Sequence, residues 1–184
     1  MVYFDARGAD NTDRTLQTAK SEALKRGIKY VVVASTRGKT GLQAAQMMQG
    51  TDIKLVVVGH STGHIEPGQQ LFDMGIKKEI EDMGVPVYLG TDALTGFPIA
   101  MRKKNRFTEE TMIADTLRMF GQGTKVCVEI VCMASDANLL PVADVIAVAG
   151  SGQGADTCLL IGANSTNQIF DIKVREILAK PRDF

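Results

Sequence analysis

Tryptophan is absent from the 184-residue sequence, and cysteine is scarce. The three cysteines, Cys127, Cys132 and Cys158, are odd in number and include no C-x-x-C pair. We therefore expect neither a disulfide framework nor a zinc knuckle, and a reducing cytoplasm is the expected compartment. Unpaired cysteines of this kind are small apolar side chains that usually lie in a core.

Long hydrophobic runs and an excess of one charge are also missing. Apolar runs such as Tyr30–Ala34 and Leu55–Val58 are far shorter than the roughly 18 residues that indicate a membrane helix. No basic segment followed by an apolar one opens the chain, so no signal peptide is expected. Lysine and arginine number 21, as do aspartate and glutamate, giving a formal charge of zero. This balance disfavours a nucleic-acid partner.

Apolar residues make up 45% of the chain and charged residues 23%, which is typical of a globular domain. No repeat or linker divides the sequence, so a single domain over residues 1–184 is predicted. Strands are expected at 3–4, 28–34, 54–58, 85–89, 145–149 and 157–161. Helices are expected at 12–26, 41–48 and 71–83. A further helix is expected to start at Thr108, and another to include residues 126–133. Residues 90–106 receive no assignment, and 170–179 fits an edge strand or a helix.

This alternation predicts an α/β fold, a three-layer αβα sandwich with a mostly parallel sheet. Ligands of such sheets bind beyond the carboxyl ends of the strands, where three polar, glycine-containing loops are expected. The first loop consists of Ser35, Thr36, Arg37, Gly38, Lys39 and Thr40. Its hydroxyls, two cations and helix-start N–H groups suit a phosphate, although its spacing is not that of a Walker loop. The alternative is a capped turn whose charges are solvated.

The second loop contains both histidines of the chain. Its candidate ligand contacts are His60, Ser61, Thr62 and Gly63. Histidines four residues apart, such as His60 and His64, bind metal when a helix carries them. Gly59 and Gly63 disfavour a helix, and the sequence places no evident carboxylate beside the pair, so no metal site is predicted. Asp92 and Thr95, after the third long strand, are weaker candidates for ligand contact.

The third loop follows the strand at 145–149. Its candidate ligand contacts are Gly150, Ser151, Gly152, Gly154, Ala155, Asp156 and Thr157. The dinucleotide-binding pattern requires a helix after such glycines, and here a strand is expected. Two interpretations remain open, a tight reversal between strands and a close backbone approach to a ligand.

Other polar features are weaker. The basic run Arg102–Arg106 is typical of a solvated surface. Glu129 and Asp136 lie on an expected helix, but nothing in the sequence pairs either of them into an acid–base couple. The pattern G-x-S-x-G occurs once, at Gly59–Gly63, but the hydrolase chain order Ser…Asp/Glu…His does not follow it, because His64 is the last histidine and no carboxylate lies between Ser61 and His64.

The segment Tyr30–Thr40 resembles the C-terminal α/β domain of pyruvate kinase, in which the corresponding loop grips the phosphate of a sugar bisphosphate effector. Ser35, Gly38 and Thr40 match the key positions of that loop, whereas Arg37 replaces a hydroxyl residue. The segment from Val145 to Ile161 resembles the last hairpin of the domain.

A closer resemblance, over nearly the whole chain, is to stand-alone proteins of this fold from archaea and bacteria. The shared motifs are Asn11-Thr12, the Ser-x-x-Gly-x-Thr loop, a His-x-Thr-Gly turn, Lys125–Ile130, Gly154–Thr157 and a Phe-Asp before a terminal Pro-Arg. The resemblance implies a pyruvate kinase C-terminal domain-like fold that binds flavin mononucleotide (FMN). The phosphate would lie on residues 35–40 and the ring between the other two loops. The catalytic barrel of pyruvate kinase is absent, so that activity is not expected.

Three functions follow from these patterns. The first is a binding protein for a phosphorylated small molecule, with FMN as the leading ligand. The second is a flavin- or sugar-phosphate-dependent enzyme, for which His60 or Glu129 is the best available catalytic group. The third is a regulatory or assembly subunit that forms homo-oligomers.

Overall fold

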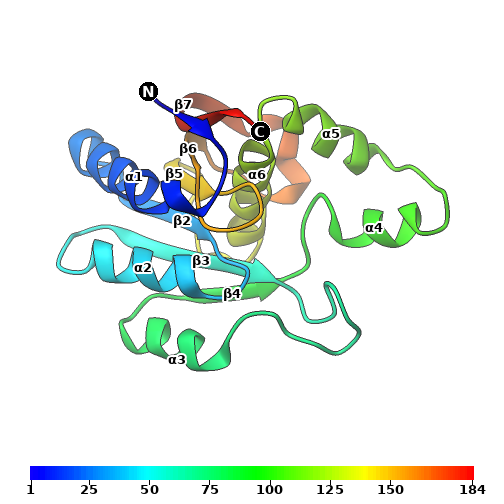
Figure 1. Ribbon diagram of the computed structural model, residues 1–184, viewed down its shortest axis with the longest axis horizontal. Helices are drawn as coiled ribbons and strands as arrows, with labels where there is room; N and C mark the ends of the chain where they lie inside the picture. Colours follow the sequence, from blue (N-terminus) through cyan, green and yellow to red (C-terminus); the bar gives the residue numbers. More distant parts are fainter.

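The computed structural model describes residues 1–184 and contains one seven-stranded sheet of order β1-β7-β6-β5-β2-β3-β4 (Figure 1). The strands are β1 Val2–Ala6, β2 Tyr30–Ala34, β3 Lys54–His60, β4 Val87–Gly90, β5 Asp144–Ala149, β6 Thr157–Gly162 and β7 Lys173–Asp183. Strand β6 runs antiparallel to both of its neighbours, and the remaining pairs are parallel. The predicted α/β fold with a mostly parallel sheet is confirmed.

Helices cover both faces of the sheet, which makes three layers. They are α1 Thr12–Arg26, α2 Lys39–Met48, α3 Met74–Asp82, α4 Gly96–Arg102, α5 Glu109–Arg118 and α6 Gln122–Asp136. Helices α1, α2 and α3 pack on one face and α6 on the other, with α5 against α6 (Figure 1). None of these helices has the length and apolar character that crossing a membrane requires.

Strand β2 shows why the sheet is buried on both sides. Val31 and Val33 belong to the core beneath α1 and α2, whereas Val32 belongs to the core beneath α6. All three are fully buried. A continuous β-branched run is the pattern that a central parallel strand requires, because its two faces both meet helices. The run therefore places the loop that follows β2 near the middle of the sheet.

Several element boundaries differ from the sequence prediction. Helix α3 begins at Met74 rather than at residue 71, because the Asp73 carboxylate accepts hydrogen bonds from the N–H groups of Gly75 and Ile76 and so caps the helix there. Strand β3 continues through His60, two residues beyond its predicted end. The segment at 170–179 is mostly strand: β7 begins at Lys173 and pairs with β6, and β1 joins its other side only from Ala179, so residues 173–178 form a sheet edge, which is one of the two alternatives expected. Residues 90–106, left without assignment, contain α4.

Candidate functional site

A cleft of about 960 Å³ opens at the carboxyl ends of β2, β3, β4 and β5. It combines parts of all three predicted loops, because these four strands are parallel and end at the same edge. The predicted residues that line it are Ser35, Thr36, Arg37, Lys39, Thr40, His60, Gly150, Gly152 and Gly154. The predicted residues that lie outside its lining are Gly38, Ser61, Thr62, Gly63, Ser151, Ala155, Asp156 and Thr157.

The first loop presents free backbone donors to the cleft. No N–H group from residue 36 to residue 40 donates to an acceptor within the protein. The loop is held in shape by Ser35, whose N–H donates to Val58 at 2.8 Å and whose hydroxyl accepts from the N–H of Gly41 at 3.1 Å. Gly38 adopts a left-handed φ of 97° at the start of α2. The predicted turn is thus present, and its donors are unpaired.

Two cations flank these donors. Arg37 and Lys39 are exposed, line the cleft and have no ion-pair partner in the protein. From the predicted basic run at 102–106, Arg102 alone lines the cleft. The other cations that line the cleft, Arg102, Arg118 and Lys125, are each paired with a carboxylate, so Arg37 and Lys39 supply the positive charge that the protein does not neutralise.

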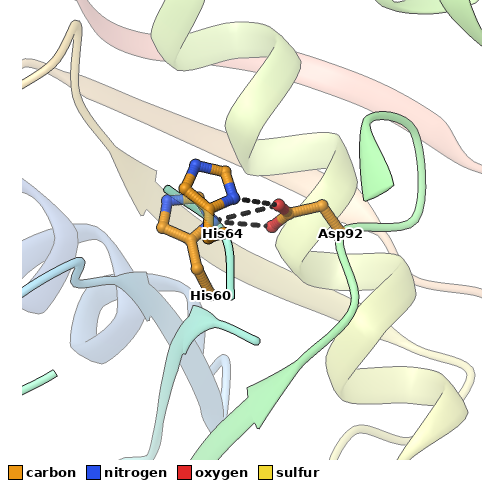
Figure 2. Close-up of side chains that lie close together, drawn as sticks. All are labelled: His60, His64 and Asp92. Carbon is orange, nitrogen blue, oxygen red and sulfur yellow. Dashed lines mark hydrogen bonds and ion pairs between the residues drawn. The ribbon is translucent and has the colours of Figure 1, made fainter. Parts of the chain in front are cut away.

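Three side chains from two strand ends form a cluster at the cleft wall (Figure 2). His60 and His64 stack with their ring centroids 3.8 Å apart and their planes inclined by 15°. The Nδ1 atom of His60 lies 2.8 Å from Oδ1 of Asp92, and that of His64 lies 3.2 Å from Oδ2. Asp92 is only 5% exposed, so the two rings shield its carboxylate from water.

The expectation that no carboxylate lies beside the histidines is wrong. His60 pairs with Gly90 across the parallel strands β3 and β4, so the residues that follow β4 come to lie beside the end of β3. Asp92, two residues after β4, thereby reaches both rings. The sequence placed Asp92 after its own strand but held no signal for which strand would be the neighbour.

The protonation of His64 depends on its burial and on the neighbouring His60 and Asp92. Burial, and then the neighbouring His60, lower the pKa of His64 below its ordinary value, although Asp92 opposes both effects. A lowered pKa keeps an imidazole neutral near neutral pH, with one ring nitrogen free to accept. Its Nδ1 contact to Asp92 is then a donated N–H hydrogen bond.

A buried ion pair forms the floor beside this cluster. Lys125 and Glu129, one turn apart on α6, are 2% and 3% exposed and contact each other directly. Glu129 Oε1 also accepts from the N–H of Leu94 at 2.8 Å and from the Thr95 hydroxyl at 3.0 Å. Burial lowers the pKa of Lys125, and Glu129 opposes that shift.

Sequence reasoning missed this pair and left Glu129 without a partner. The available signal was two opposite charges four residues apart within the apolar segment Lys125–Ile130. The pair and its hydrogen bonds tie α6 to Leu94 and Thr95, two and three residues after Asp92, and so help to hold the cluster in position. Asp136, the other carboxylate considered on this helix, accepts from the N–H of Thr166 at 2.9 Å and does not line the cleft.

The third loop is a tight reversal whose glycine backbone faces the cleft. Asp156 is fully buried and accepts from the N–H groups of Gly8 and Ser151 and from the hydroxyl of Thr157. The N–H of Ala155 donates to the Thr12 hydroxyl at 3.0 Å. These side chains fix the loop against the start of α1. Asp156, Ala155 and Thr157 therefore support the loop, whereas Gly150, Gly152 and Gly154 line the cleft.

No protein-family model matches the chain, so its function is inferred from the cleft and the side chains around it.

Proposed function

We propose that the chain binds a phosphorylated small molecule in this cleft, with FMN as the ligand to test first. The observation that carries the proposal is the run of unpaired N–H groups from residue 36 to residue 40, flanked by Arg37 and Lys39. Backbone donors at a helix start, together with the helix dipole, attract an anion. A phosphate satisfies several such donors at once, and the guanidinium group of Arg37 and the ammonium group of Lys39 add charge-assisted hydrogen bonds.

The rest of the cleft is suited to the organic part of such a ligand. Its volume of about 960 Å³ lies within the range of small-molecule sites. Away from the phosphate loop, apolar side chains line it, namely Pro98, Ile99, Val126, Ile130 and Met133. A flat ring system buried against these residues would leave its polar edge near the Gly150–Gly154 backbone.

The choice of FMN and of a pyruvate kinase C-terminal domain-like fold rests on the sequence resemblance. The topology is compatible with both proposals. Residues 35–40 follow the central strand β2, and β5 and β6 form the hairpin at the position that the resemblance implies. The sheet and the cleft alone would equally suit a sugar phosphate, which is the ligand to test second.

Paired titrations with FMN and riboflavin test the proposal, because the two differ only in the phosphate. Flavin fluorescence is followed as protein is added, with wild type, Arg37→Ala and Thr40→Ala. The control is Lys103→Ala, which removes an exposed cation outside the cleft lining.

We expect FMN to bind more tightly than riboflavin. Loss of the Arg37 contact should weaken FMN binding about tenfold or more, since a hydrogen bond to a charged group contributes about 1.5–3 kcal/mol. Lys103→Ala should bind FMN as wild type does. Equal affinity for FMN and riboflavin would refute the phosphate site. Failure to bind FMN, together with saturable binding of a sugar phosphate, would refute only the flavin.

A further inference from the structure

We propose that His60, His64 and Asp92 bind one divalent transition-metal ion, with Zn²⁺ as the ion that fits best. The chain has only two histidines, and both meet the same carboxylate at the cleft wall (Figure 2). One donor atom from each of the three residues lies within 4.8 Å of the others. This proposal goes beyond phosphate binding and does not depend on it.

The donor set selects the class of ion. Two imidazole nitrogens and one carboxylate oxygen suit zinc and its first-row neighbours, whereas Mg²⁺ and Ca²⁺ prefer oxygen ligands throughout. Three protein ligands also leave a coordination position open, which is the arrangement of zinc sites that act on a ligand rather than only hold a fold. Here the open side faces the cleft, because His60, His64 and Asp92 all line it.

The donor spacing is close to what an ion needs. Oδ2 of Asp92 lies 3.1 Å from Nδ1 of His60 and 3.2 Å from Nδ1 of His64. Ligand atoms at about 2.0–2.2 Å from a tetrahedral ion are separated from one another by roughly 3.3 Å. The two nitrogen-to-oxygen separations therefore need only small shifts, and all three donor atoms already lie within 4.8 Å of one another.

The ring orientations require one larger change. The rings are within 15° of parallel, so the two Nδ1 atoms do not yet point to a common centre. Turning the His64 ring about its Cβ–Cγ bond brings them together. This side chain is 23% exposed and lies in a segment without a helix or strand, so it has room to turn. Each neutral ring then carries its proton on Nε2, and the ion replaces the two hydrogen bonds to Asp92.

Outer contacts hold the carboxylate in place. Glu129 fixes the backbone of Leu94 and the hydroxyl of Thr95, two and three residues after Asp92 in the chain. Partners of this kind orient metal ligands and tune their affinity. The competing interpretation is a metal-free triad in which the histidines only tether the loop after β3 to the end of β4. The two interpretations predict opposite results on addition of zinc.

Calorimetric titration of ZnCl₂ into chelator-treated, dialysed protein tests the site. We expect one saturable site per chain in wild type, and affinity at least about tenfold weaker in His60→Ala, His64→Ala and Asp92→Asn, since even outer-shell partners are worth 10–100-fold. The control is Glu66→Gln, which removes an exposed carboxylate two residues after His64. Circular dichroism confirms that each variant is folded, and MgCl₂ in place of ZnCl₂ should give no saturable site.

Nitrogen-15 NMR of the imidazoles supplies a second readout that does not require any variant to fold. Two histidines give a spectrum of four ring nitrogens, so each can be assigned. Zinc should shift the Nδ1 signals of both rings. Absence of saturable binding, binding that survives both histidine substitutions, or unchanged Nδ1 signals would overturn the proposal. All measurements are made without flavin, so a failure of FMN binding does not affect them.

Discussion

Glu129 accepts a hydrogen bond from the backbone N–H of Leu94, 35 residues earlier in the chain, at a distance of 2.8 Å. The same carboxylate contacts Lys125 and the hydroxyl of Thr95. One buried side chain on α6 therefore fixes the segment that carries Asp92 between β4 and α4. The buried ion pair on α6 therefore also helps to set the geometry of the cleft wall.

Removing Lys125 should be costly. Lys125→Met leaves Glu129 buried without its counter-charge, and breaking a buried pair in this way costs about 3–5 kcal/mol. The double variant Lys125→Met with Glu129→Gln should recover part of the loss, because the amide oxygen still accepts from Leu94 and no charge remains. Urea unfolding of both variants measures the difference. A double variant no more stable than Lys125→Met would show that the charge of Glu129 is not what destabilises the single variant.

Asp156→Ala should lower stability without touching the ligand. The substitution leaves the half-buried N–H groups of Gly8 and Ser151 without their acceptor. A fully buried unpaired group costs about 1–3 kcal/mol, so we expect a loss near the lower end of that range for each. Thermal unfolding should show the loss, while FMN affinity per folded molecule stays the same. A variant of unchanged stability but weakened FMN binding would instead make Asp156 a ligand contact.

Gly38→Ala should destabilise the phosphate loop for two reasons. Its φ of 97° disfavours a side chain, and an added Cβ would lie 2.7 Å from Cγ2 of Ile76. Gly50→Ala is the matched control, with a φ of 75° and nothing within 4 Å of its Cβ. We expect about 1 kcal/mol from the backbone in both, and about 1–3 kcal/mol more at position 38 from overpacking. Equal losses in chemical denaturation would mean that Ile76 moves aside freely.

The cysteine thiols should be unreactive in the folded protein. Burial raises the pKa of Cys132 to about 12, and it raises the pKa values of Cys127 and Cys158 as well. The thiolate is the reactive form, and it is scarce at any pH well below the pKa. At pH 8 a thiol reagent should modify none of the three rapidly in native protein, and all three in denaturant. Rapid labelling of native protein would contradict their burial.

A helix or strand could be predicted where the residues of a short segment are enough to determine it. The β-branched run Tyr30–Ala34 and the left-handed Gly27 that ends α1 needed no knowledge of the rest of the chain. The position of Asp92 could not be predicted, because it depends on which strand pairs with β3. The role of Glu129 depends on a backbone N–H from another loop. Asp156 was predicted as a ligand contact because its hydrogen-bond partners include Gly8, which is distant in the sequence and could not be foreseen.

Strand β1 has β7 as its only neighbour in the sheet, and Val2 pairs with Ala179. During synthesis β1, the first strand of this sheet, must therefore wait for β7, the last strand of the sheet, before it can pair. Until then β1 remains an unpaired segment, and β6 presents an open edge where β7 will insert. Open edges of this kind are sites of association between chains. Completion of the sheet is thus tied to translation of its last strand, and a pause before β7 would prolong the period in which nascent chains can associate.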